Sequence, residues 1–289
     1  MITIKIPGCY GTTNNKVLAV TLFSSSIIFL FNTILYFLND ENKTNNHYKL
    51  YDSETYFKSV NISNMLMILF YIFDLFLDNS FWDNKGIRAI YVDESETPNN
   101  DRLIVRPINS HSSIFLFHVG IYSWLHINET TPYYYASQLF SISQIFMGII
   151  SYLWWASNLN NIHLIDNLCM ELIINSISTL VWTTIFPSYE LHFIFLSILY
   201  FIIHGYNFKT ARLVELSLNF LVGCVISTYY YGNGDQYYFL IGTLLTLGGL
   251  IPKIADRVYR FQLGTFFFHF MEAYGFIVFY QWIQTISTK

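Results

Sequence analysis

Nine long apolar segments constrain this 289-residue chain more than any other feature of its sequence. A helix needs about 20 mostly apolar residues to cross roughly 30 Å of hydrocarbon, because each residue rises about 1.5 Å. Their continuous apolar runs lack the alternating pattern of a membrane β-barrel. The sequence therefore predicts an all-α, polytopic transmembrane helix bundle. The segments are Val17–Leu38, Val60–Leu77, Ser110–Ile127, Ala136–Ser157, Asn167–Phe186, Leu191–Tyr206, Arg212–Tyr231, Tyr237–Pro252 and Gln262–Ile286.

The composition agrees with a membrane location. Hydrophobic residues make up 53% of the chain and charged residues only 12%, whereas about a quarter of the residues of a soluble domain are charged. The aromatic share of 19% is typical of interfacial belts of Tyr and Trp. The net charge is −4, and no basic stripe follows a phosphate backbone. Nucleic acid is therefore excluded as a partner, and membrane lipids and other membrane-protein subunits are expected instead.

A polar stretch divides the apolar segments into two groups. It runs from Asp78 to Pro107 and contains the sequence DESETPNND, which is typical of a loop. We therefore expect an N-terminal segment over residues 1–108, with two transmembrane helices and this loop. A seven-helix transmembrane block is expected over residues 109–289. The connections within the block are brief, so consecutive helices should be antiparallel neighbours.

Basic residues gather on one side of the predicted block. The loops on the other side, Asn128–Tyr135, Pro187–Glu190 and Gly232–Gln236, carry none. Positive loops face the cytosol or the mitochondrial matrix, so the asymmetry favours an odd number of helices after Pro107. The first 39 residues contain two lysines, no acidic residue and no recognisable cleavable secretory signal. These features favour the mitochondrial inner membrane over the endoplasmic reticulum.

Polar landmarks recur at separate places in the predicted block. Asp166 follows Ser151 by fifteen residues, and the last helix carries a single histidine, His269. From Arg102 to its end, the chain resembles the alkaline ceramidase superfamily, which includes the seven-helix adiponectin-type receptors. The landmarks of this resemblance are the sequence RPINSHSS at residues 106–113, Gly120, Ser151, Asp166, Met170, Gly264 and His269.

The resemblance implies a zinc-dependent amide hydrolase. In such an enzyme a Ser and a His lie four residues apart on the second helix, an Asp lies on the third, and a His-x-x-x-His pair lies on the seventh. The three His hold zinc, which lowers the pKa of its bound water to about 7, so that hydroxide attacks an amide. In this chain Ser151, Asp166 and His269 keep their places. Trp155 and Thr265 stand at the other two ligand positions.

Trp155 and Thr265 predict that the metal centre is a relic. An indole nitrogen has no lone pair to offer a metal, and a hydroxyl is a poor substitute for imidazole. Arg106 also stands where the resemblance implies an acidic residue, which argues against a neighbouring calcium site. We therefore expect no catalytic residue, no bound metal and no cofactor. The preferred interpretation is a non-catalytic accessory subunit of a larger membrane complex, such as a mitochondrial respiratory assembly, or a lipid-binding protein.

Other interpretations of the site stay open. An active lipid amide hydrolase would need a zinc site rebuilt from His118, His269 and either Asp166 or Glu272. His269 and Glu272 lie three residues apart on one helical face, where a buried hydrogen bond between them is the structural alternative. Asp166 is expected to cap its helix by accepting amide hydrogen bonds, with a metal-site relic as the alternative. A seven-helix receptor is a third functional class.

Ionisable and aromatic residues of the apolar segments raise two further possibilities. Ionisable groups inside a membrane are costly and often mark a proton or ion path, although near helix ends they reach water. Aromatic runs line lipid or quinone pockets, or form interfacial belts and packing surfaces. The residues concerned are Asp74, His204 and Glu215 for the path, and Tyr133–Tyr135, Trp154-Trp155 and Tyr229–Tyr231 for the aromatic runs.

Overall fold

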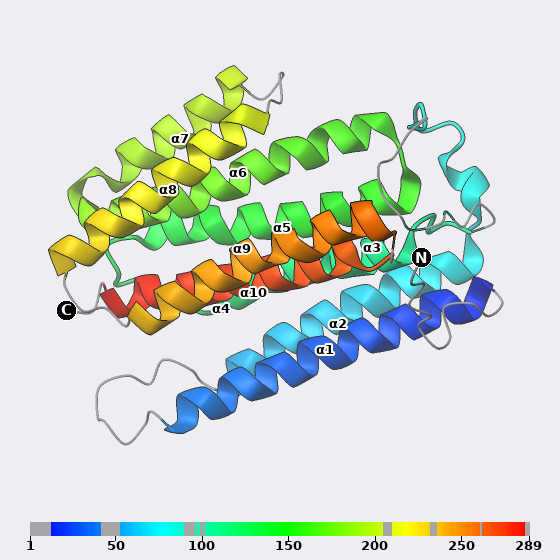
Figure 1. Cartoon of the computed structure of the whole chain (residues 1–289), viewed down its shortest axis with the longest axis horizontal. Helices are drawn as coiled ribbons and strands as arrows, with labels where there is room; N and C mark the ends of the chain where they lie inside the picture. Colours follow the sequence, from blue (N-terminus) through cyan, green and yellow to red (C-terminus); the bar gives the residue numbers. More distant parts are fainter. Residues whose placement is uncertain are drawn as a thin grey trace.

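The computed structural model describes residues 13–41, 53–89, 96, 98, 102–204, 210–231, 236–260 and 262–286. Within these ranges the chain is helical and has no β-strand (Figure 1). The N-terminal helices are α1 (Thr13–Glu41) and α2 (Ser53–Phe76). The later helices are α3 (Pro107–Ser112), α4 (Ile114–Leu125), α5 (Tyr134–Ser157), α6 (Asn160–Ile185), α7 (Glu190–His204), α8 (Thr210–Tyr231), α9 (Gln236–Tyr259) and α10 (Gly264–Ile286).

Five helices are long and apolar enough to cross a membrane. They are α5, α6 and α9 over their full lengths, α2 over Phe57–Phe76 and α8 over Arg212–Tyr229. Helices cover most of each of the nine predicted apolar segments, but Ser110–Ile127 is divided between α3 and α4, and α4 and α7 have only 12 and 15 residues. The expected all-α class is therefore confirmed, and the chain is a multi-pass integral membrane protein.

The N-terminal hairpin of α1 and α2 packs on the chain's own later helices. The hairpin contacts α3 and α4 on one side of the later helices. Figure 1 shows α7 and α8 on the other side of these helices. Two buried histidines make polar contacts with the hairpin. His111 Nε2 lies 2.9 Å from Thr21 Oγ1, and His118 Nδ1 lies 3.0 Å from Ser63 Oγ. The predicted boundary at residue 108 falls within α3, whose first residue is Pro107.

Among the helix bounds that differ from the sequence prediction, the start of α6 and the end of α9 bear on the site. α6 begins at Asn160 with Leu159 as its N-cap, so the expectation that Asp166 caps this helix is wrong. The buried residues in this region recur at helical spacing and include Leu159, Asp166 and Cys169. Because these residues pack inward, the helix continues through the polar stretch. α9 continues through Pro252 to Tyr259.

The extension of α9 positions the start of α10. The carboxylate of Asp256 accepts hydrogen bonds from the backbone amides of Gln262 (2.8 Å) and Gly264 (3.2 Å). An added Cβ at Gly264 would lie 2.2 Å from Asp256 Cβ, so the turn requires glycine there. These contacts hold α9 and α10 together at the end of the bundle that carries His269.

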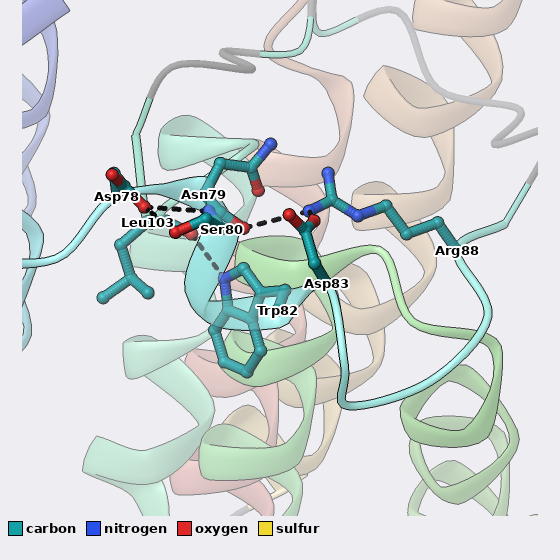
Figure 2. Close-up of polar contacts among 7 residues, drawn as sticks. All are labelled: Asp78, Asn79, Ser80, Trp82, Asp83, Arg88 and Leu103. Atoms are coloured by element: carbon teal, nitrogen blue, oxygen red, sulfur yellow. Dashed lines mark hydrogen bonds and ion pairs between the residues drawn. The ribbon is translucent and has the colours of Figure 1, made fainter.

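The polar linker begins with a short 3-10 helix, η2 (Asn79–Trp82), which Figure 2 shows with its contacts. Asp78 caps η2, because its carboxylate accepts from the backbone amide of Ser80 (2.9 Å) and from the Ser80 hydroxyl. These two donors hold the pKa of Asp78 below its usual value. Trp82 Nε1 donates to the carbonyl of Leu103 (2.8 Å), and Arg88 pairs with Asp83 (2.7 Å).

The later described residues of the linker contact one end of the later helices. The amides of Val105 and Arg106 donate to the carbonyls of Ala156 (3.0 Å) and Trp155 (3.1 Å) in the last turn of α5, where such carbonyls lack intrahelical donors. The carboxylate of Glu96 accepts from the first amides of α3, those of Ile108 and Asn109 (both 2.9 Å). The chain's own helices therefore hold Glu96 and residues 105–106 of the linker in place.

Candidate functional site

Four helices bring the retained landmark residues together in one buried polar centre. Ser112 Oγ of α3 lies 2.8 Å from His269 Nδ1 of α10. The Ser113 hydroxyl donates to Ser151 Oγ of α5 (3.0 Å), and Ser151 hydrogen-bonds to Asp166 of α6. All five side chains are buried. Ser151, Asp166 and His269 are the positions that the resemblance implies, and the structure adds Ser112 and Ser113, which connect their helices.

Lys253 supplies a positive charge to this centre from α9. It interacts electrostatically with Asp166, His269 and Glu272, and its Nζ lies 5.0 Å from the ring centroid of Phe268. This role was not predicted, because the predicted helix ended at Pro252 and Lys253 followed it in a loop. The sequence feature that indicates the longer helix is the pair of apolar residues Ile254 and Val258 beyond Pro252.

Trp155 and Thr265, at the positions where the resemblance implies zinc ligands, are both buried. Trp155 is 6% exposed, and its Nε1 has no hydrogen-bond partner among the described residues. Thr265 is 1% exposed. An indole N–H is only a donor, and zinc sites in proteins use imidazole, thiolate or carboxylate. One imidazole, one carboxylate and hydroxyl groups do not fit the three-histidine site that the resemblance implies.

The residues considered for a rebuilt zinc site do not converge. His118 faces Ser63 of α2, whereas His269 faces Ser112. Among the described residues, no group of three or more His, Cys, Asp or Glu side chains is placed to hold a metal ion. Among the described residues His269 makes no hydrogen bond to Glu272, the structural alternative for this pair; its Nδ1 contacts Ser112 Oγ instead.

An apolar cavity of about 310 Å³ lies beside the polar centre, between α4, α5, α6, α8, α9 and α10. Its volume is at the lower end of the range for ligand pockets, about 300–1,000 Å³. Glu272 is the ionisable member of its lining, and Ser217, Thr243 and Thr246 add hydroxyl groups. The apolar lining includes Leu116, Met147, Ile177, Phe220, Leu250 and Phe276. The cavity can accommodate a hydrocarbon chain with a polar end near Glu272.

The remaining sequence candidates lie elsewhere. Asp74 accepts from the amide of Ile104 (3.0 Å) and lies 3.4 Å from Arg102 Nε, so it ties α2 to the linker. Glu215 lines a second cavity, between α6, α7 and α8. The side chain of His204 lies outside the described residues. The described residues therefore do not show one proton or ion path through these three positions.

The aromatic runs proposed for a lipid pocket do not line this cavity or the second one. Tyr133 and Trp154 are buried, and the rings of Trp154 and His163 stack with centroids 4.2 Å apart. Tyr229 is exposed, whereas the side chains of Tyr230 and Tyr231 lie outside the described residues. The buried members therefore serve packing, and aliphatic residues provide most of the pocket surface.

Comparison with known proteins finds no matching family model, curated protein or solved structure.

Proposed function

We propose that this chain is a non-catalytic, lipid-binding membrane protein on a ceramidase-like scaffold, and that it serves as an accessory subunit of a larger membrane complex. The observation that carries the proposal is the 310 Å³ apolar cavity beside a centre with a single histidine. The cavity supports lipid binding. The groups at the implied zinc site are one imidazole, one carboxylate and hydroxyls, and they support loss of the zinc chemistry that the resemblance implies.

The lining of the cavity favours a single hydrocarbon chain as its occupant. Apolar side chains from six helices provide most of the surface, so a lipid chain would gain close van der Waals contact there. The hydroxyls of Ser217, Thr243 and Thr246 and the carboxylate of Glu272 offer hydrogen bonds to a polar end. A lipid bound in this way would stabilise the packing of α8 and α9 against α10.

We place the complex in the mitochondrial inner membrane as part of the same proposal. Low charge and the gathering of basic residues on one side of the later helices support this location. Large apolar side chains exposed on α7, α8 and α9 provide surfaces for lipid or for neighbouring subunits, and include Phe195, Ile202, Val225, Leu244 and Ile251.

Filling the cavity tests lipid binding. Ser217→Phe places a large ring in the lining, so we expect lipid occupancy to fall by about tenfold, which corresponds to ~1.4 kcal/mol. Native mass spectrometry of the full chain in mild detergent measures the occupancy. Val222→Phe adds a ring on the exposed face of the same helix and should leave occupancy unchanged. Equal occupancy in the two variants would show that the cavity does not hold the lipid.

A zinc-dependent lipid amide hydrolase remains the second candidate. The observation that favours it is the intact hydrogen-bonded series from Ser113 through Ser151 to Asp166 next to His269. Such a series would position a carboxylate beside a metal-bound water if further ligands were available. The metal content of the purified protein separates this candidate from the first.

A further inference from the structure

The 310 Å³ cavity of the proposed lipid site reaches the surface of the protein between α8 and α9. Three of its lining residues are exposed, and all three belong to these two helices. They are Leu247 (59% exposed) and Leu250 (46%) of α9 and Leu221 (40%) of α8. The lining residues of α4, α5, α6 and α10 are buried or half-buried, as Leu116 and Phe276 illustrate. The three leucines therefore form the rim of a lateral opening.

The packing of the two helices leaves room for this opening. α8 packs on α6, and α9 packs on α10, as Figure 1 shows. The two helices follow each other in the chain, but their described residues do not form a closely packed pair. Side chains at the rim, and not close backbone contact, therefore separate the cavity from the surroundings of the protein.

The opening lies at the middle of both helices. The apolar span of α8, Arg212–Tyr229, has Leu221 near its centre, and α9 has Leu247 near its centre. Leu247 is about 17 Å from each end of α9, at about 1.5 Å per residue. Because both helices are long and apolar enough to cross a membrane, the opening faces the hydrocarbon core of the bilayer and not water.

The helix segments along the opening contain no ionisable residue. Residues 217–221 of α8 read SLNFL, and residues 243–250 of α9 read TLLTLGGL. The carboxylate of Glu272 belongs to the cavity lining, on α10. A charged head group is costly at the centre of a bilayer, whereas a hydroxyl carries no charge and can donate a hydrogen bond to a carboxylate inside the cavity.

We propose that the cavity takes up a neutral single-chain lipid, of the monoacylglycerol class, directly from the hydrocarbon core through the opening between α8 and α9. This inference rests on the lipid binding proposed above, and it adds the entrance and the class of head group. The hydrocarbon chain passes between Leu221 and Leu247. The hydroxyls of the head group donate to Glu272.

A single-chain lipid with a charged head group, such as a fatty acid or a lysophospholipid, is the competing ligand. Its charge would have to cross the hydrocarbon core at the opening. A fatty-acid carboxylate would then meet the carboxylate of Glu272, which repels it. Lys253 carries the opposite charge, but it already interacts with both Glu272 and Asp166. The neutral head group avoids both costs.

Uptake from a bilayer tests the entrance. The full chain is placed in lipid nanodiscs that contain monopalmitoylglycerol with a deuterated chain, and native mass spectrometry follows the uptake of this probe with time. Leu247→Trp places a large ring at the opening and should slow uptake by about tenfold, by raising the barrier to entry. Leu244→Trp is the matched control and should keep the wild-type rate. Leu244 is 60% exposed on the same helix and lies outside the cavity lining.

A second pair of variants on α8 gives an independent comparison. Leu221→Trp should slow uptake, and Val222→Trp, on the exposed face of the same helix, should not. Equal uptake rates within both pairs, with the wild type occupied, would overturn the lateral entrance and leave lipid binding intact.

The class of head group is tested with lysophosphatidylcholine of the same chain length. The wild type should take up monopalmitoylglycerol about tenfold faster, because the charged head group meets a higher barrier. Equal rates for the two lipids would overturn the preference for a neutral head group. A wild-type chain that takes up neither lipid would overturn both this inference and the lipid-binding function on which it rests.

Discussion

Gly148→Ala is expected to destabilise the protein by about 1–3 kcal/mol or more, the range for overpacking a close contact. A Cβ on Gly148 would lie 2.3 Å from the backbone nitrogen of Phe117, and one on Gly120 would lie 2.6 Å from that of Ile145. α4 and α5 therefore approach backbone to backbone at two glycines, as small residues allow in membrane helices. Gly148 is one turn from Ser151, so the same approach sets the contact between Ser113 and Ser151.

Thermal unfolding in detergent measures this effect, and Gly248→Ala is its matched control. A Cβ on Gly248 would meet only the terminal methyl of Met271, at 2.8 Å, and a flexible side chain can move aside. Alanine also favours a helix over glycine by about 1 kcal/mol. We expect a marked loss of Tm for Gly148→Ala and little change for Gly248→Ala. Similar Tm values for the two variants would contradict the close approach of α4 and α5.

Asp74→Ala is expected to cost about 3–5 kcal/mol, the range for breaking a buried ion pair by removal of one partner. The change removes the acceptor of the Ile104 amide and leaves the largely buried Arg102 without its carboxylate. Since Asp74 ties α2 to the linker, we expect faster hydrogen exchange in α2 and in residues 102–106 as well as a lower Tm.

Asp83→Ala provides the comparison for Asp74→Ala. Asp83 also pairs with an arginine, Arg88, but its side chain is 61% exposed, and exposed pairs contribute at most about 1 kcal/mol. The two variants therefore remove chemically similar pairs that differ in burial. A loss for Asp74→Ala no greater than that for Asp83→Ala would show that the linker does not anchor the hairpin.

The length of the apolar runs predicted most of the helices, because a helix must be long enough to cross the hydrocarbon thickness of a bilayer. Val17–Leu38 and Arg212–Tyr231, for example, lie within α1 and α8. Helix ends were harder to predict, because they depend on neighbours far along the chain. Asn160 starts α6 early because residues such as Leu159 and Cys169 pack inward, and Asp256 extends α9 because it caps α10.

The candidate site could be predicted only in part. Ser151, Asp166 and His269 were proposed from the resemblance, whereas the pairing of His269 with Ser112 depends on how α10 packs against α3. The cavities could not be predicted at all, because each is a space left between several helices. His118 shows the same limit, since only the placement of the hairpin reveals that it faces Ser63 and not His269.

The zinc content of the full chain tests the proposed loss of catalysis most directly. The protein is purified in mild detergent without chelator, and its metal is measured by inorganic mass spectrometry. We expect far less than one zinc per chain, and no difference between the wild type and His269→Ala, because Trp155 and Thr265 replace two of the three implied ligands. Near-stoichiometric zinc that His269→Ala removes would contradict the non-catalytic account and establish a rebuilt metal centre.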